Sequence, residues 1–125
     1  MNDLDQQFLI LQQQFIANLS NRKQRLTGFY AGLFSLSTNA AKNTVKLVDK
    51  NALIGLHTEA HNLAGTAGCY QVADLAYVSK QLENHLWSVL DKNKKIDADE
   101  AWQKNLYKLV NNLINFIDDL IEGEV

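Results

Sequence analysis

The sequence predicts an all-α protein, an antiparallel four-helix bundle with an additional N-terminal helix. Two observations support this fold class. The 125 residues include no proline, which costs about 3 kcal/mol inside a helix, so the whole chain can be helical. Apolar residues also recur at steps of three and four, while strict alternation is nearly absent. Long amphipathic helices joined by short turns are typical of an antiparallel bundle.

The first two helices are predicted from apolar residues that share one helix face. The first stripe follows Asn2 or Asp3 as a cap and consists of Leu4, Phe8, Leu11 and Phe15. The chain restarts at residues 20–21, and the second stripe consists of Leu26, Phe29, Leu33 and Leu36. Polar residues 37–39 interrupt this stripe, and the stretch to Val48 is predicted as a short further helix.

Three more helices complete the predicted bundle. The third follows residues 49–51, ends near Gly68, and carries Leu53, Leu56, Ala60, Leu63 and Ala67. The fourth ends in the polar turn 91–95 and carries Leu75, Ser79, Leu82, Leu86 and Val89. The last begins at Asp97 or Asp99, stops at Gly123, and carries Trp102, Leu106, Leu109, Leu113, Phe116 and Leu120.

Composition limits the class of protein. The content of 46% hydrophobic and 21% charged residues predicts one folded domain spanning residues 1–125. The net charge of −2 argues against a nucleic-acid partner and against a polybasic membrane anchor. No apolar run approaches the ~18 residues of a membrane span, and a basic signal region is absent. The single cysteine, Cys69, fits a reducing compartment and is expected to be a semi-buried packing residue, so we expect a cytoplasmic protein.

His61 lies on the third helix away from the predicted core. At about 100° per residue, it falls about 130° from the centre of the apolar stripe, so the imidazole should face solvent. Its helical neighbours include three residues with little or no side chain: Ala64, Gly65 and Gly68. Glycine inside a helix costs about 0.5–1 kcal/mol relative to alanine. Spacing alone leaves two interpretations open, an ordinary surface histidine or a site that another protein's backbone can approach.

The segment Ala60-His61-Asn62-Leu63-Ala64-Gly65-Thr66-Ala67 resembles the phosphorylation motif A-H-x-L-K-G-[ST]-[AS] of histidine-containing phosphotransfer (HPt) domains. The likeness continues at Leu75 and at Leu82-Glu83. Upstream, Asp49 and Leu56 match an acidic turn residue and a core leucine. The resemblance is close from Asp49 to Glu83 and looser in the flanking helices.

This resemblance implies an HPt-like bundle that acts as a phosphoryl carrier of a two-component phosphorelay. His61 would accept a phosphoryl group from a receiver-domain aspartate and pass it to another receiver. A neutral imidazole nitrogen is a suitable nucleophile, since the reference pKa of histidine is near 6.5. The expected partners are response-regulator receiver domains and a hybrid histidine kinase. The chain would be a monomer without a cofactor of its own, because Mg²⁺ is expected on the receiver.

Two positions depart from the family pattern. The lysine usually found three residues after the histidine is Ala64, which removes a cation that would help to hold phosphoryl oxygens. Lys80, on the next helix, is the candidate to replace it. The glycine usually found ten residues after the histidine is Gln71, for which we expect a changed turn. The loss at Ala64 keeps an alternative open, an HPt-like interaction module that docks a receiver or histidine kinase without being phosphorylated.

The remaining site predictions follow from the resemblance and from helical spacing. Glu83 either orients His61 by accepting its Nδ1 proton or is a plain solvated glutamate. Thr66 is expected to bond its own helix. His57 lies close enough to act electrostatically on His61, and Gly68 and Gly65 leave the surface open.

A metal site and an enzyme are both less consistent with the sequence. His57 and His61 share a helix face, but the zinc-protease pattern H-E-x-x-H needs a glutamate where Thr58 stands. Trp87 and Trp102 are interpreted as core or rim aromatics. The sequence has no P-loop, dinucleotide fingerprint or nucleophilic serine or cysteine motif, so we predict neither an enzyme nor a complete histidine kinase.

Overall fold

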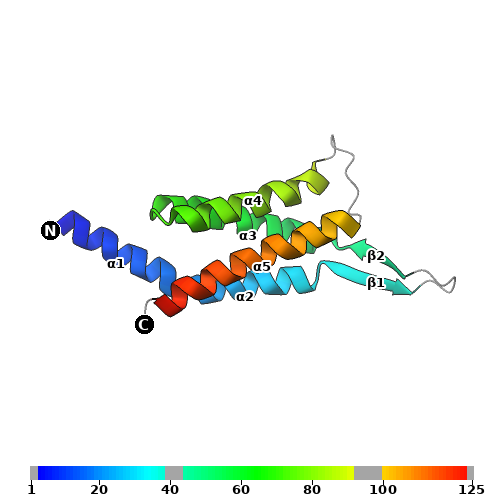
Figure 1. Cartoon of the computed structure of the whole chain (residues 1–125), viewed down its shortest axis with the longest axis horizontal. Helices are drawn as coiled ribbons and strands as arrows, with labels where there is room; N and C mark the ends of the chain where they lie inside the picture. The colour runs from blue at the N-terminus through cyan, green and yellow to red at the C-terminus, as the bar shows by residue number, and fades with distance from the viewer. Residues whose placement is uncertain (1–2, 39–43, 92–99, 124–125) are drawn as a thin grey trace.

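The computed structural model describes residues 3–38, 44–91 and 100–123 (Figure 1). Its helices are α1 (Asp3–Ala17), α2 (Leu19–Ala31), α3 (Lys50–Cys69), α4 (Ala73–Leu90) and α5 (Glu100–Gly123). Only Asn18 separates α1 from α2, so the two form one long N-terminal helix that bends there. The predicted helical fold is confirmed as four helices packed together. The predicted caps Asn2, Asp97 and Asp99 and most of the turn 91–95 lie outside the described residues.

The helices pack around one core. The α2 and α4 helices each contact both α3 and α5, so these four surround a common interior. All five residues of the predicted α3 stripe are buried: Leu53, Leu56, Ala60, Leu63 and Ala67. In α5 the buried face is turned slightly from the predicted one, because Val110 and Ile117 are buried whereas Leu109 and Phe116 are only partly buried.

The α1 helix departs from its predicted role. Its N-terminal part projects beyond the other helices (Figure 1), so Leu4 and Leu11 of the predicted stripe are exposed. Only Phe15 and Ile16, near the bend, are buried. The helix is held at the end of α3, where the Phe15 ring stacks on Tyr70 at 5.3 Å between ring centroids and the Gln12 side chain donates to the Tyr70 carbonyl at 2.7 Å.

A β-hairpin replaces the helix predicted up to Val48. The α2 helix ends at Ala31, and β1 (Phe34–Thr38) pairs antiparallel with β2 (Thr44–Val48), with Phe34 opposite Val48. The helical prediction was wrong here because this stretch is rich in β-branched residues, which lose side-chain freedom in a helix and fit a strand. The hairpin extends from the end of the molecule opposite α1 (Figure 1).

The connection between α3 and α4 fixes how these two helices face each other. Gln71 has φ = 60°, in the left-handed region that favours glycine. The Val72 amide donates to the Ala67 carbonyl at 2.8 Å and the Gln71 amide to the Gly68 carbonyl at 3.2 Å, the pattern of a Schellman motif. The left-handed residue that terminates α3 is therefore Gln71, two residues beyond the last helical residue Cys69, while Gly68 lies within the last helical turn.

Close packing between α2 and α3 depends on Gly55. A Cβ atom at this position would overlap the Phe29 ring, which lies directly over the α3 backbone. Gly55 therefore has a packing role that the sequence analysis did not assign.

Candidate functional site

His61 lies on the outer face of α3. Asp49 caps the start of this helix, and its side chain accepts a hydrogen bond from the Ala52 amide at 3.0 Å. Burial of the opposite face turns His61 outward, and its side chain is 65% exposed. The angular prediction for this residue is confirmed.

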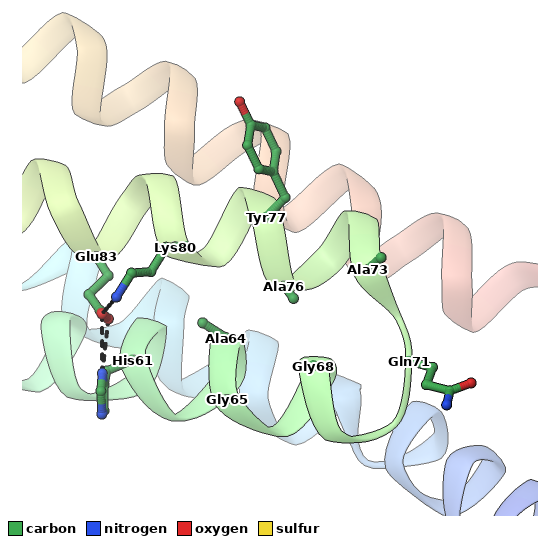
Figure 2. Close-up of a pocket in the computed structure, with 10 residues that line it drawn as sticks. All are labelled: His61, Ala64, Gly65, Gly68, Gln71, Ala73, Ala76, Tyr77, Lys80 and Glu83. Carbon is green, nitrogen blue, oxygen red and sulfur yellow. Dashed lines mark hydrogen bonds and ion pairs between the residues drawn. The ribbon is translucent and has the colours of Figure 1, made fainter.

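Glu83 and Lys80 of α4 reach toward His61 across the α3/α4 interface (Figure 2). His61 Nδ1 lies 2.9 Å from Oε2 of Glu83 and 3.1 Å from its Oε1. Lys80 Nζ donates to Oε1 at 2.8 Å. The Glu83 side chain is only 6% exposed, so it is not a plain solvated glutamate.

The charges around Glu83 determine which nitrogen of His61 is free. Burial raises the pKa of Glu83, but the hydrogen bonds from Lys80 and His61 outweigh burial, and the net pKa is lowered. The carboxylate is therefore ionised near neutral pH and can only accept hydrogen bonds. Nδ1 of a neutral His61 must then carry the ring proton, which leaves Nε2 with an unprotonated lone pair.

His57 lies one helical turn before His61, with its ring nearly parallel at 6.4 Å between centroids. The half-exposed Trp87 also contacts His57, at 5.7 Å between ring centroids. Burial lowers the pKa of His57, with the Glu83 charge acting against this shift and His61 and Lys80 adding to it. His57 is therefore mainly neutral at pH 7, and an effect of His57 on His61 stays a prediction.

A groove of about 810 Å³ runs between α3 and α4 beside His61 (Figure 2). Its floor is formed by small residues from both helices: Ala64, Gly65, Gly68, Ala73 and Ala76. A Cβ atom added at Gly65 or Gly68 would meet no atom within 4 Å, so packing does not require glycine at either position. Tyr77, Lys80 and Glu83 line the groove from α4.

A second depression, of about 670 Å³, lies on the other side of His61, between α2 and α3. Arg22 and Arg25 line it from α2, and Arg25 Nε donates to Oε1 of Glu59 at 2.8 Å. Neither arginine was predicted from the sequence as a site residue. Their only signal was a basic run in α2, which does not reveal that it packs beside His61.

The other predicted site residues have simpler roles. The Thr66 hydroxyl donates to the Asn62 carbonyl at 2.7 Å, which confirms that it bonds its own helix. Cys69 is exposed, and the prediction of a semi-buried residue was wrong because this last residue of α3 lies on the surface, where it lines the open depression between α2 and α3. Trp102 is buried, with its ring stacked on His85 at 4.8 Å.

A metal-binding cluster and a membrane-spanning helix are both absent from the described parts of the chain. Residues 3–38, 44–91 and 100–123 bring together no group of three histidine, cysteine or acidic side chains that could hold a metal ion. None of the described helices has the length and apolar character needed to cross a membrane.

Comparisons with family models, curated proteins and solved structures found no match to this chain. The likeness to HPt domains therefore depends on the motif residues around His61, and the family assignment stays a prediction.

Proposed function

We propose that this chain is a histidine phosphotransfer protein, an HPt-like antiparallel bundle that carries a phosphoryl group on Nε2 of His61. One observation carries the proposal: an exposed imidazole is held through Nδ1 by a buried, ionised carboxylate, which leaves Nε2 facing outward. An ordinary surface histidine would not require a hydrogen bond from Nδ1 to a buried carboxylate.

The surroundings support transfer between proteins. The groove floor of small residues beside His61 gives a partner's backbone room to approach, and packing within the chain does not require glycine at position 65. The ring of contacts among α2, α3, α4 and α5 is consistent with the HPt-like bundle that the motif implies.

The proposed reaction begins with an aspartyl phosphate on a receiver domain. The Nε2 lone pair attacks phosphorus, a P–N bond forms, and the acyl P–O bond breaks to release the aspartate carboxylate. The Nδ1 proton stays on the ring, where Glu83 stabilises the positive charge that develops as Nε2 becomes bonded. The receiver supplies Mg²⁺ and the other groups that stabilise the moving phosphoryl, so the carrier provides mainly position and access.

A second function is favoured by Ala64. The absence of a cation at this groove position fits an interaction module that docks a receiver or kinase without accepting phosphate. The two functions differ in one observable, phosphate on His61.

The test is incubation with a panel of receiver domains charged by acetyl phosphate, followed by detection of acid-labile, base-stable phosphate on the chain. We expect labelling of the wild type, loss of labelling in His61→Gln, and retained labelling in His57→Gln, the matched histidine one turn away. Stable complexes with a receiver but no phosphate on His61 would support the interaction module instead. Labelling that persists in His61→Gln would overturn the site assignment.

A further inference from the structure

The depression between α2 and α3 places two arginines on the side of His61 that faces away from Glu83. Its lining includes Arg22 and Arg25 from α2 and, from α3, His61 together with Glu59, Asn62 and Gly65. No large side chain stands at Gly65, so the edge of the imidazole opens directly into this depression.

The direction of the imidazole decides which cations a group on Nε2 can reach. Nδ1 points to Glu83, and the ring extends from there away from α4 (Figure 2). The in-plane lone pairs of the two ring nitrogens diverge, so a substituent on Nε2 lies on the far side from Glu83. Lys80, whose Nζ is bonded to Oε1 of Glu83, is on the Nδ1 side.

Both arginines keep hydrogen-bonding capacity for an anion. Arg25 contacts Glu59 through Nε, which uses one of the five N–H donors of the guanidinium. Arg22 Cζ lies 5.7 Å from the centroid of the Phe15 ring, a cation–π contact that is not itself a hydrogen bond. Planar guanidinium groups bind phosphoryl oxygens in pairs of hydrogen bonds.

We propose that Arg22 and Arg25 form the binding site for the phosphoryl oxygens of phospho-His61, in place of the cation missing at Ala64. The inference rests on the proposed function, because it needs a phosphoryl group on Nε2. Arg25 exchanges its contact with Glu59 for the phosphoryl oxygens, and Glu59 becomes the competing anion of the site. The ligand is a phosphoryl dianion bound by the two arginines of α2, whereas Lys80 donates its hydrogen bond to Glu83.

The test phosphorylates the protein chemically with potassium phosphoramidate, so that no receiver is needed. The pH titration of the phosphoryl group is then followed by ³¹P NMR. Nearby cations favour the dianion and lower its pKa, so Arg22→Gln/Arg25→Gln should raise the titration midpoint by about 0.5–1 pH unit. Lys23→Gln is the matched control, since it removes one charge from the same helix at a residue paired with Asp118 of α5, and it should leave the midpoint unchanged.

A second variant guards against a structural effect of losing both arginines. Glu59→Gln keeps Arg22 and Arg25, frees Arg25 from its ion pair, and should lower the midpoint. Equal midpoints for the wild type and the double arginine variant would overturn the inference, as would a larger rise in Lys80→Met. If phosphoramidate places no phosphate on wild-type His61, the proposed function fails together with the inference. A phosphorylated protein with unchanged midpoints refutes the inference alone.

Discussion

Replacing Glu83 by glutamine removes the charge behind His61 and keeps the length of the side chain. Glu83 is buried and accepts from His61 Nδ1 at 2.9 Å and from Lys80 Nζ at 2.8 Å. A hydrogen bond to a charged group contributes about 1.5–3 kcal/mol, against about 1 kcal/mol for a neutral one. Because the His61 side chain is 65% exposed, solvent screening reduces the loss at Nδ1 to about 1 kcal/mol.

A loss of about 1 kcal/mol corresponds to about a fivefold change in an equilibrium. We therefore expect Glu83→Gln to lower the ratio of the Nδ1–H to the Nε2–H tautomer of His61 about fivefold. The rate of phosphorylation by phosphoramidate should also fall, by no more than this factor, because the rate follows the fraction of molecules with a free Nε2 lone pair. The ¹⁵N chemical shifts of the ring measure the first effect. Glu100→Gln is the control, since its exposed ion pair with Lys104 is a surface contact. A folded Glu83→Gln protein with an unchanged tautomer ratio and rate would refute the argument.

The same substitution should change the acid stability of the protein. The pKa of Glu83 is lower in the folded chain than its ordinary value of 4.5, since hydrogen bonds from Lys80 and His61 outweigh burial. The resulting stabilisation is present above pH 4.5 and is lost as the pH falls through the folded pKa. Urea unfolding should therefore show that the wild type loses more stability than Glu83→Gln below pH 4.5. Parallel pH profiles of the two proteins would contradict this assignment.

Three further predictions concern the same region. Gln71→Gly should raise the free energy of unfolding by about 0.5–1 kcal/mol in urea titrations, because relief of the left-handed conformation exceeds the added chain entropy; a destabilised variant would contradict the strain. His61→Gln should change the unfolding free energy by less than about 1 kcal/mol, since the side chain is exposed, and a loss above about 2 kcal/mol would mark a structural histidine. Gly65→Leu should keep or raise the melting temperature because its Cβ meets open space, yet it should slow transfer from a phosphorylated receiver. Unchanged transfer kinetics in Gly65→Leu would remove the role of the open surface.

The sequence predicted the parts of the fold that depend on burial of a helix face. The α3 stripe is buried throughout, because apolar residues that recur at the helical period lie on one face, and neighbouring helices cover that face. The same rule placed His61 outside the core, and the resemblance placed Glu83 beside it. For α1 the apolar pattern was less informative, because it does not show whether another helix covers the apolar face. Leu4 and Leu11 of that face are exposed.

The errors of the sequence analysis have local physical causes. Leu33 and Leu36 continue the three-residue spacing of α2, but the β-branched residues that follow favour strands, and the chain turns into β1 instead. Gln71 could not be identified as the end of α3 from its type, since glutamine is uncommon at positive φ.

The positively charged side chains around His61 could not be predicted from spacing along one helix. The motif has a lysine three residues after the histidine on the same helix, and in this chain that position is the uncharged Ala64. Arg25 and Glu59 are 34 residues apart in the chain, and their ion pair exists only because α2 packs beside α3. Lys80, three residues before Glu83, lies on α4 and is engaged by that carboxylate. The two helices that flank α3 thus contribute cations to opposite sides of one imidazole, the α4 lysine to the anion behind Nδ1 and the α2 arginines to the depression beyond the ring. A missing lysine in the motif therefore does not imply a site without positive charge.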